Sequence, residues 1–430
     1  MPLHLNLEPS DKSINQLNSD DKAFHDWYRF VLSFPPHLVS YYLSKFKATK
    51  KQIVLDPFSG TGTTLVECKK LGFSCVGIEA NPMAHFASQT KLNWAISPRL
   101  LLDNADEIIE QFTQELNHST DSTQHKSLVI DAQKLLFKNA ISSRPLHKVL
   151  TLLHCIEQMH HQDCYDHERL ALAQAAVRAS NIRFAPEVGI SRSLKEDAPV
   201  IQLWQTAIKT MANDITHLSS LSNQQRAAVH TLVHLGDARI PSQYLPKHSI
   251  DIVITSPPYP NEKDYTRATR LESVLLGFFK NKQDLQTIKK TLVRSNSRGI
   301  YTQDDDDLLV ERYPMVVDLA QEIDKRRVEW GKSSGFSRLY SRAVKLYFGG
   351  MARHLKNLQQ VLRPNAQLAY VVGDQASYLQ VHIRTGDILA HIAQDMGYKL
   401  LEIELFRTRH ASKTDMDLCE EVVLLQWPGS

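Results

Sequence analysis

The sequence has little cysteine, little excess charge of either sign and no long apolar run. Its 5 cysteines, spread over 430 residues without a Cys-x-x-Cys pair, exclude a disulfide framework and disfavour zinc-finger and redox motifs. The 50 Lys and Arg residues nearly balance 47 Asp and Glu residues, which leaves a net charge of +3. Binding of nucleic acid through global positive charge is therefore excluded, and any basic surface must be local.

Signals for export and for membrane insertion are also missing. The first residues contain neither a basic stretch nor an apolar one, and no run of about 18 apolar residues occurs anywhere. We therefore expect a soluble, cytoplasmic protein without a membrane partner. The 42% hydrophobic and 23% charged residues are ordinary globular proportions that allow a large core.

Short apolar runs that alternate with glycine turns and helical stretches predict an α/β fold. The run at residues 53–55 precedes a glycine turn and a helix, and a second run at 74–78 ends at Glu79. Further strands are expected at residues 250–254 and 368–372, and an antiparallel pair at 399–406 and 420–427. This pattern predicts a Rossmann-like, doubly wound and mostly parallel sheet.

Two long stretches without strand signals interrupt this pattern. Residues 100–230 have helical periodicity, and residues 281–345 mix basic and acidic side chains. We interpret both as insertions that face the substrate. The remaining residues, 21–99, 231–280 and 346–430, then form one sheet domain of ordinary size.

A glycine turn follows the first strand, in the sequence Asp56-Pro57-Phe58-Ser59-Gly60-Thr61-Gly62-Thr63-Thr64. A tight turn between a strand and a helix leaves backbone N–H groups free for an anionic ligand group. Leu65 stands where a dinucleotide site would carry a third glycine, which disfavours a nicotinamide-dependent dehydrogenase. Cofactor contacts are expected from Ser59, Gly60, Gly62 and Thr63.

Two acidic residues, Asp56 and Glu79, end the strands beside this turn. Asp56 would repel a pyrophosphate, but it suits a zwitterionic amino acid whose ammonium needs an anion while its carboxylate faces the helix N-terminus. Glu79 is placed to accept hydrogen bonds from a ribose diol. An adenosine joined to an amino acid is S-adenosylmethionine. We expect Asp237 to accept from its adenine amino group and Phe58 to line the pocket.

The tetrapeptide Ser256-Pro257-Pro258-Tyr259 follows another strand and is stiffened by its two prolines. An amine conjugated to a base is a poor nucleophile. Hydrogen bonds from it to Ser256 and to the Pro257 carbonyl would localise its lone pair for attack on a sulfonium methyl group. Tyr259 can stack on an extruded base. The loop therefore predicts methyl transfer to an exocyclic amine.

Together, Phe58-Ser59-Gly60-Thr61-Gly62 and Ser256-Pro257-Pro258-Tyr259 resemble the FxGxG and [Ser/Asn/Asp]-Pro-Pro-[Tyr/Phe/Trp] motifs of the S-adenosylmethionine-dependent amino-methyltransferases of DNA. The serine version is similar to the cytosine-N4 branch, whereas Asp or Asn is more usual in adenine-N6 enzymes. The resemblance implies a class I methyltransferase fold. It assigns Asp56, Phe58, Gly60, Gly62 and Glu79 to the cofactor and Ser256 and Tyr259 to the target base. Phe34, before the first strand, is similar to the family's segment that closes over the methionine.

The resemblance implies a DNA cytosine-N4 methyltransferase with double-stranded DNA as its partner, and we expect a modification enzyme of a restriction or defence system. Adenine-N6 methylation is the nearest alternative, followed by methylation of an RNA base and by a non-catalytic DNA-binding protein. Methylation of cytosine C5 needs a cysteine nucleophile, placed by that family on a Pro-Cys dipeptide, and the sequence has none.

An enzyme that acts on a base in duplex DNA has to flip the base out and grip the phosphates. Basic residues downstream of the catalytic tetrapeptide are candidates, namely Lys263, Arg267, Arg270, Lys289, Lys290, Arg294 and Arg298. Which insertion reads the DNA sequence stays open. No metal site is expected: His160, Cys164 and His167 share a helical face, but without paired ligands a plain helix surface is the simpler interpretation.

Overall fold

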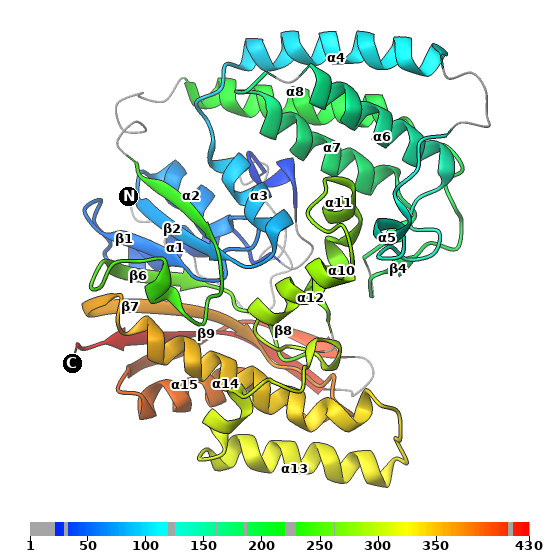
Figure 1. The fold of residues 1–430 in the computed structure, drawn as a ribbon. Coiled ribbons are helices and arrows are strands. Elements are labelled where there is room, and N and C mark those ends of the chain that lie inside the picture. The colour runs from blue at the N-terminus through cyan, green and yellow to red at the C-terminus, as the bar shows by residue number, and fades with distance from the viewer. Residues whose placement is uncertain are drawn as a thin grey trace.

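The fold is described from a computed structural model that covers residues 22–29, 33–118, 125–159, 161–184, 187–219, 229–261, 263–411 and 416–429. A central sheet separates two groups of helices (Figure 1). Within these residues, no helix combines the length and the apolar character that crossing a membrane requires.

Seven strands form the sheet, in the order β5-β2-β1-β6-β7-β9-β8. β1 (Ile53–Asp56) pairs in parallel with β2 (Ser74–Glu79) and β6 (Ile250–Thr255); β5 (Thr231–Leu235) extends the sheet beyond β2, and β7 (Leu362–Gly373) beyond β6. β9 (Met416–Trp427) is antiparallel to both β7 and β8 (Lys399–Ala411). The order changes direction at β1 and β6, and ligands of open α/β sheets bind beside the carboxyl ends of strands at such a switch point.

Helices cover both faces of the sheet. Because successive side chains of a strand point to opposite faces, each strand contributes buried side chains to both sides. Val54 and Ile252 pack on one side with α1 (His37–Lys45), α2 (Thr63–Leu71) and α3 (Pro82–Leu92). Leu55 and Val253 pack on the other side with α14 (Tyr340–Leu358) and α15 (Thr385–Asp395). Continuous apolar strands of this kind are typical of a doubly covered parallel sheet.

The segment between β2 and β5 forms a helical layer outside α3. Its long helices are α4 (Pro98–His118), α6 (Ser143–Gln158), α7 (Tyr165–Ala179) and α8 (Val200–Ser219), with the short α5 (Ile130–Gln133) and the two-stranded pair β3 (Ile182–Arg183) and β4 (Gly189–Ile190). The four long helices stack above the sheet in Figure 1. Trp204 on α8 is fully buried and donates to the Glu168 carbonyl on α7 at 2.9 Å, which ties two of them together.

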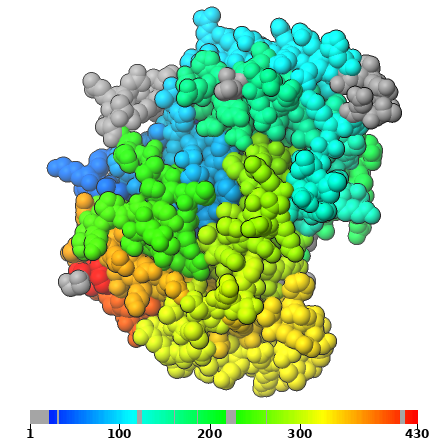
Figure 2. All heavy atoms as spheres, in the orientation of Figure 1, coloured from blue at the N-terminus to red at the C-terminus, as the bar shows by residue number. Residues whose placement is uncertain are grey.

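The segment after β6 lies between this layer and the opposite end of the molecule. It contains α10 (Tyr265–Ala268), α11 (Arg270–Leu275) and α12 (Lys282–Thr291), and α13 (Pro314–Glu329) then packs against α14. Figure 2 shows the yellow-green chain around α10–α12 at the surface, between the cyan and green helical layer and the yellow helices. Short turns called η (one turn of 3-10 helix) connect these elements, among them η3 (His25–Trp27), η5 (Ser297–Gly299) and η7 (Ser337–Leu339).

The fold class predicted from the sequence is confirmed, including the antiparallel strands at the C-terminus. One local detail differs, because β7 already begins at Leu362, before the strand expected at residues 368–372. Asn365 has a positive φ of 67°, and the pairing with β6 shifts register there. The added part of the strand therefore carries a bulge. The division into one sheet domain and two insertions stays a prediction.

Candidate active site

The glycine turn connects the end of β1 to the start of α2 and lies against the end of β2. The Ser59 amide donates to the Ile78 carbonyl (3.1 Å), and the Gly62 amide donates to the Ser59 carbonyl (2.7 Å). Gly62, the residue before α2, has a φ of 86°, a conformation that favours glycine, and a Cβ there would lie 2.5 Å from Ser88 Oγ on α3. The turn therefore packs closely against α3.

Asp56 and Glu79 are acidic side chains held at this turn by hydrogen bonds. One Asp56 oxygen accepts from Thr255 Oγ1 (2.6 Å) and the Phe58 amide (3.1 Å); the other is buried and has no partner among the described residues. Burial raises the pKa of Asp56 to about 6, although these hydrogen bonds oppose the shift. The unpartnered oxygen fits the ammonium group of an amino acid.

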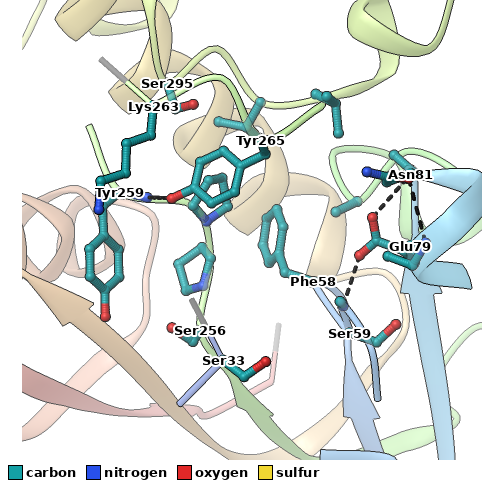
Figure 3. Close-up of a pocket in the computed structure, with 18 of the residues that line it drawn as sticks. Ser33, Phe58, Ser59, Glu79, Asn81, Ser256, Tyr259, Lys263, Tyr265 and Ser295 are labelled. Carbon is teal, nitrogen blue, oxygen red and sulfur yellow. Dashed lines mark hydrogen bonds between the residues drawn. The ribbon is translucent and has the colours of Figure 1, made fainter. Parts of the chain in front are cut away.

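Glu79 accepts from the Gly60 amide (2.8 Å) and from the Asn81 amide (2.7 Å). Burial raises the pKa of Glu79 to about 7, against the effect of these two bonds. The carboxylate thus joins the turn to the start of α3, where Asn81 caps the helix through the Met83 amide (3.0 Å). Its side chain borders the cavity next to the turn (Figure 3).

A single cavity of about 360 Å³ joins the glycine turn to the Ser-Pro-Pro-Tyr loop. Phe58, Ser59, Gly60 and Thr63 line it together with Glu79, Ser256, Pro257, Pro258 and Tyr259, and Phe34 borders it from the N-terminal segment. The ring of Phe58 packs against His354 of α14, with 5.0 Å between the ring centroids. The structure thus brings together at one cavity the cofactor and catalytic residues expected from the sequence, apart from Asp56, Gly62 and Asp237, which do not border it.

The catalytic loop is held by Tyr265, at the start of α10. The Tyr265 hydroxyl accepts a hydrogen bond from the Tyr259 backbone amide at 3.1 Å, whereas the Tyr259 side chain points the other way (Figure 3). A Cβ on Gly373 would lie 2.9 Å from the Tyr259 ring, so the absence of a side chain at the end of β7 makes room for this ring. Burial raises the pKa of Tyr259, and the hydroxyl stays neutral at physiological pH.

Asp237 does not reach the cavity. Its carboxylate forms an ion pair with Arg239 (2.7 Å), which also binds Asp306 (2.7 Å), and the cavity is bordered here by Gly236 and Ala238 instead. The Asp237 carboxylate is thus already paired with a basic residue two positions away and is not available to a ligand. Asp237 is therefore not placed to accept from an adenine in this cavity.

The basic candidates separate into two groups. Arg270 and Lys289 face Asp264, and Lys289 bonds its carboxylate at 2.6 Å; Arg294 is buried and paired with Asp304 at 2.8 Å. Although burial opposes it, the Lys289 ammonium lowers the pKa of Asp264. Asp264 and Asp304 thus provide two carboxylates for these three cations, and Lys289 and Arg294 also border the cavity, so a DNA contact by these residues stays a prediction. Lys263, Lys290 and Arg298 are exposed and Arg267 is half-buried.

The structure adds residues that the motifs did not indicate. Tyr265, Asn81 and Ser33 border the cavity, as do Arg407 of β8 and Glu420 of β9. Arg407 and Glu420 face each other across the antiparallel pair and form an ion pair. Arg407 lies one residue beyond the strand expected at 399–406, so the sequence did not indicate this pair.

The cysteine and histidine residues of the first insertion lie deeper than expected. Cys155, Cys164 and His167 are buried in the core, and His167 Nε2 lies 3.0 Å from the Asn93 carbonyl. The apolar positions of α6 and α7 pack against each other and against α8, and these side chains lie in the core between the helices. His160 lies outside the described residues, and within those residues no cluster of metal-ligating side chains occurs.

A parallel sheet whose switch point carries both motifs in one cavity, beside a buried carboxylate oxygen suited to an amino acid, is the arrangement of an S-adenosylmethionine-dependent methyltransferase. A family model described as DNA methylase, of the N6/N4 methyltransferases, matches residues 9–89. The chain is thus similar to the N6/N4 DNA methylases, a family that uses S-adenosylmethionine as its methyl donor.

Similarity to characterised relatives extends over nearly the whole chain. The type II methyltransferase M.BsoBI of Geobacillus stearothermophilus is 24% identical over 435 residues, which cover 94% of this chain and 84% of the relative. M.AvaI of Nostoc sp. is 24% identical over 437 residues, with 95% and 85% covered. M.MvaI of Kocuria varians is 22% identical over 383 residues, with 79% and 82% covered.

Proposed function

We propose that this DNA methyltransferase acts on the exocyclic N4 amine of a cytosine flipped out of duplex DNA. The observation that carries the proposal is the shared cavity, in which the Ser-Pro-Pro-Tyr loop borders the same space as the glycine turn. Ser256 in the first position of the loop favours cytosine N4 over adenine N6, by its resemblance to the cytosine branch. Adenine N6 is the second candidate.

Some residues around the cavity bind the methyl donor, and others orient the target amine. Asp56 and Glu79, with the Gly60 and Gly62 backbone, hold the methyl donor; when bound, the donor supplies an electrophilic methyl group. Ser256 Oγ and the Pro257 carbonyl accept the two N–H bonds of the amine and turn its lone pair toward that methyl group. The amine releases one proton to water, and the ring of Tyr259 forms the wall against which the base stacks.

The reaction product distinguishes the candidates. Purified protein is incubated with unmethylated duplex DNA, or with RNA, and with labelled S-adenosylmethionine, and the digested nucleosides are analysed. We expect N4-methylcytosine from DNA, whereas N6-methyladenine or labelled RNA would replace the proposal by the corresponding alternative. Ser256→Ala and Tyr259→Ala should each slow transfer about 100-fold or more, with cofactor affinity nearly unchanged. Ser249→Ala, at a half-buried serine just before β6 that does not border the cavity, is the matched control.

The exposed cations near the cavity support duplex DNA as the substrate. Lys263 and Arg409 border the cavity, and burial followed by the Arg409 charge lowers the pKa of Lys263. Arg267 lies over the ring of Phe137 (4.6 Å), and Arg298 lies over that of Phe336 (5.6 Å). Burial, and then the Arg298 charge, lowers the pKa of Arg267. Cations that repel one another around a cavity create a site for phosphates.

This basic rim, Lys263, Arg267, Arg298 and Arg409, is tested through the salt dependence of binding. Arg267→Ala and Arg298→Ala should each weaken binding to any duplex sequence and reduce the slope of log K against log salt by about 1. Arg363, at the start of β7 and paired with Asp251 (2.9 Å), supplies the control variant Arg363→Ala. An unchanged slope in both rim variants would place the DNA elsewhere.

We also propose a companion restriction or defence nuclease, because the relatives are named type II methyltransferases. DNA modified by this protein should then resist an extract of the source cells that cleaves unmodified DNA. Equal cleavage of modified and unmodified DNA would leave the protein without such a partner.

A further inference from the structure

A lysine lies buried directly behind the glycine turn. Lys91, near the end of α3, is 1% exposed, and its Nζ donates a hydrogen bond to the Thr61 carbonyl at 3.1 Å. An ammonium has three N–H bonds to donate. No carboxylate lies within 4.0 Å of Nζ in the parts of the chain that the structure describes. A buried charge that lacks a counter-ion is costly, so this position calls for an anion that is not part of the described chain.

A small cavity of about 20 Å³ opens at Lys91, enough for one group of the size of a water molecule. His25, Arg29 and Pro36 line it with Lys91, and four further residues, Ser33, Phe34, Thr61 and Thr63, line both this cavity and the active-site cavity. The two spaces therefore adjoin at the glycine turn. A ligand that lies along the turn can extend one polar end toward Nζ.

The Glu67 carboxylate, which lies near this cavity through its partner His25, is already engaged by two other cations. His25 Nε2 lies 2.8 Å from Glu67 Oε1 on α2, and Lys70 pairs with the same carboxylate at 2.8 Å. Burial lowers the pKa of Lys91 to about 7, with the Asp26 charge acting against this shift and the Arg29 charge in its favour. In the protein without ligand, the amine therefore alternates between its neutral and charged forms near neutral pH.

We propose that Lys91 binds the carboxylate of the methionine portion of S-adenosylmethionine, in the small cavity between Phe34 and the turn. Asp56 offers an unpartnered oxygen for the ammonium, and Lys91 supplies the opposite charge for the carboxylate. The two side chains then recognise the two charges of one amino acid. This assignment depends on the methyl donor and is independent of which base is methylated.

Binding of two ligands to Lys91→Met tests the assignment by calorimetry. S-adenosylhomocysteine carries the carboxylate, whereas 5′-methylthioadenosine carries the same nucleoside without the amino acid. The variant should bind S-adenosylhomocysteine about 10- to 100-fold more weakly, the range of a charge-assisted hydrogen bond, and should bind methylthioadenosine within about twofold of the wild type. Equal weakening of both ligands would mean that Lys91 only shapes the turn through Thr61, and would overturn the proposal.

Lys69 provides a matched control, because its Nζ also donates to a carbonyl, that of Leu92 (2.6 Å), but borders neither cavity. Lys69→Met should leave both affinities unchanged. If Lys91→Met does not fold, the wild type alone decides the question, since the carboxamide of S-adenosylhomocysteine should then bind about 10-fold or more weakly than the acid. Failure of the wild type to bind S-adenosylhomocysteine would instead contradict the cofactor assignment itself.

Proton uptake gives a second measurement. A carboxylate bound to Lys91 favours the charged amine, so at pH 8 the wild type should take up a fraction of a proton when S-adenosylhomocysteine binds. Asp56 and Glu79, with pKa values of about 6 and 7, are then mostly ionised already and contribute little. Calorimetry in buffers of different ionisation enthalpy measures this uptake. The same uptake in Lys91→Met would assign the proton to another group.

Discussion

Replacement of Gly62 by alanine tests how closely the cofactor turn packs against α3. Two costs are expected. The φ of 86° is unfavourable for a residue with a Cβ, by about 1–2 kcal/mol. The new Cβ would also lie 2.5 Å from Ser88 Oγ, and overpacking of a tight core costs about 1–3 kcal/mol. Together, Gly62→Ala should lower the free energy of unfolding by about 2–5 kcal/mol, a large part of the ~5–15 kcal/mol of a typical domain.

Two companion variants separate these costs. Gly277, after α11, has a φ of 79° and open space around its Cα, so Gly277→Ala should cost only the backbone part. Ser88 Oγ is buried and has no hydrogen-bond partner among the described residues, so Ser88→Ala should be nearly neutral. In the double variant the nearest atom becomes Ser88 Cβ, at 3.2 Å. We expect the double variant to regain about 1–3 kcal/mol relative to Gly62→Ala.

Urea unfolding followed by circular dichroism measures all four stabilities, and calorimetry with S-adenosylhomocysteine measures the site. Gly62→Ala should bind this ligand more weakly, and Ser88→Ala should restore part of the affinity. If Gly62→Ala costs no more than Gly277→Ala, or if Ser88→Ala gives no rescue, the turn does not pack on α3 as described.

Two further predictions concern a tyrosine and a buried acid. Tyr265→Phe removes the hydroxyl that accepts a hydrogen bond from the Tyr259 amide. In a methyl-transfer assay, kcat should fall about 10-fold and KM for the methyl donor should change little. A rise in KM as large as the fall in kcat would contradict a role in positioning. Glu168, fully buried on α7 and bonded to Asn104, has its pKa raised by burial to about 7. Because the folded protein favours the protonated form, stability falls as pH rises from about 4.5 through 7. Glu168→Gln should therefore raise the thermal midpoint at pH 8.5 and change it little at pH 5, and a gain of equal size at both pH values would refute the titration.

The sequence predicts those parts of this protein that depend on neighbours in the chain. The glycine turn and the Ser-Pro-Pro-Tyr loop have local signatures, and parallel pairing of β1 with β2 and β6 then brings their carboxyl ends together. Alternation of apolar side chains likewise indicates strands buried on both faces. For these reasons the fold, and the meeting of the two motifs at one cavity, follow closely from the sequence.

Features that depend on distant partners could not be predicted in this way. Asp237 appears free in the sequence, but it forms an ion pair with Arg239, which the distant Asp306 also binds. Arg294 belongs to a basic run, yet Asp304 folds back onto it and buries it. Lys91 is an ordinary helix residue in the sequence, and its position next to the cofactor turn results only from the packing of α3 behind that turn. Ion pairs between residues far apart in the chain, unlike the alternation of apolar residues in a strand, cannot be recognised from local spacing.

The strand order has a consequence for biosynthesis. β5 pairs with β2 along its whole length, yet it leaves the ribosome about 150 residues after Glu79. At a synthesis rate of about 5–20 residues per second, the outer edge of β2 stays unpaired for roughly 8–30 seconds before β5 is made. Throughout that interval a nascent chain exposes a row of unsatisfied main-chain groups to which a second nascent copy can add. Slow translation or crowded polysomes should therefore favour misassembly of this enzyme, and early capture by a chaperone should favour its yield.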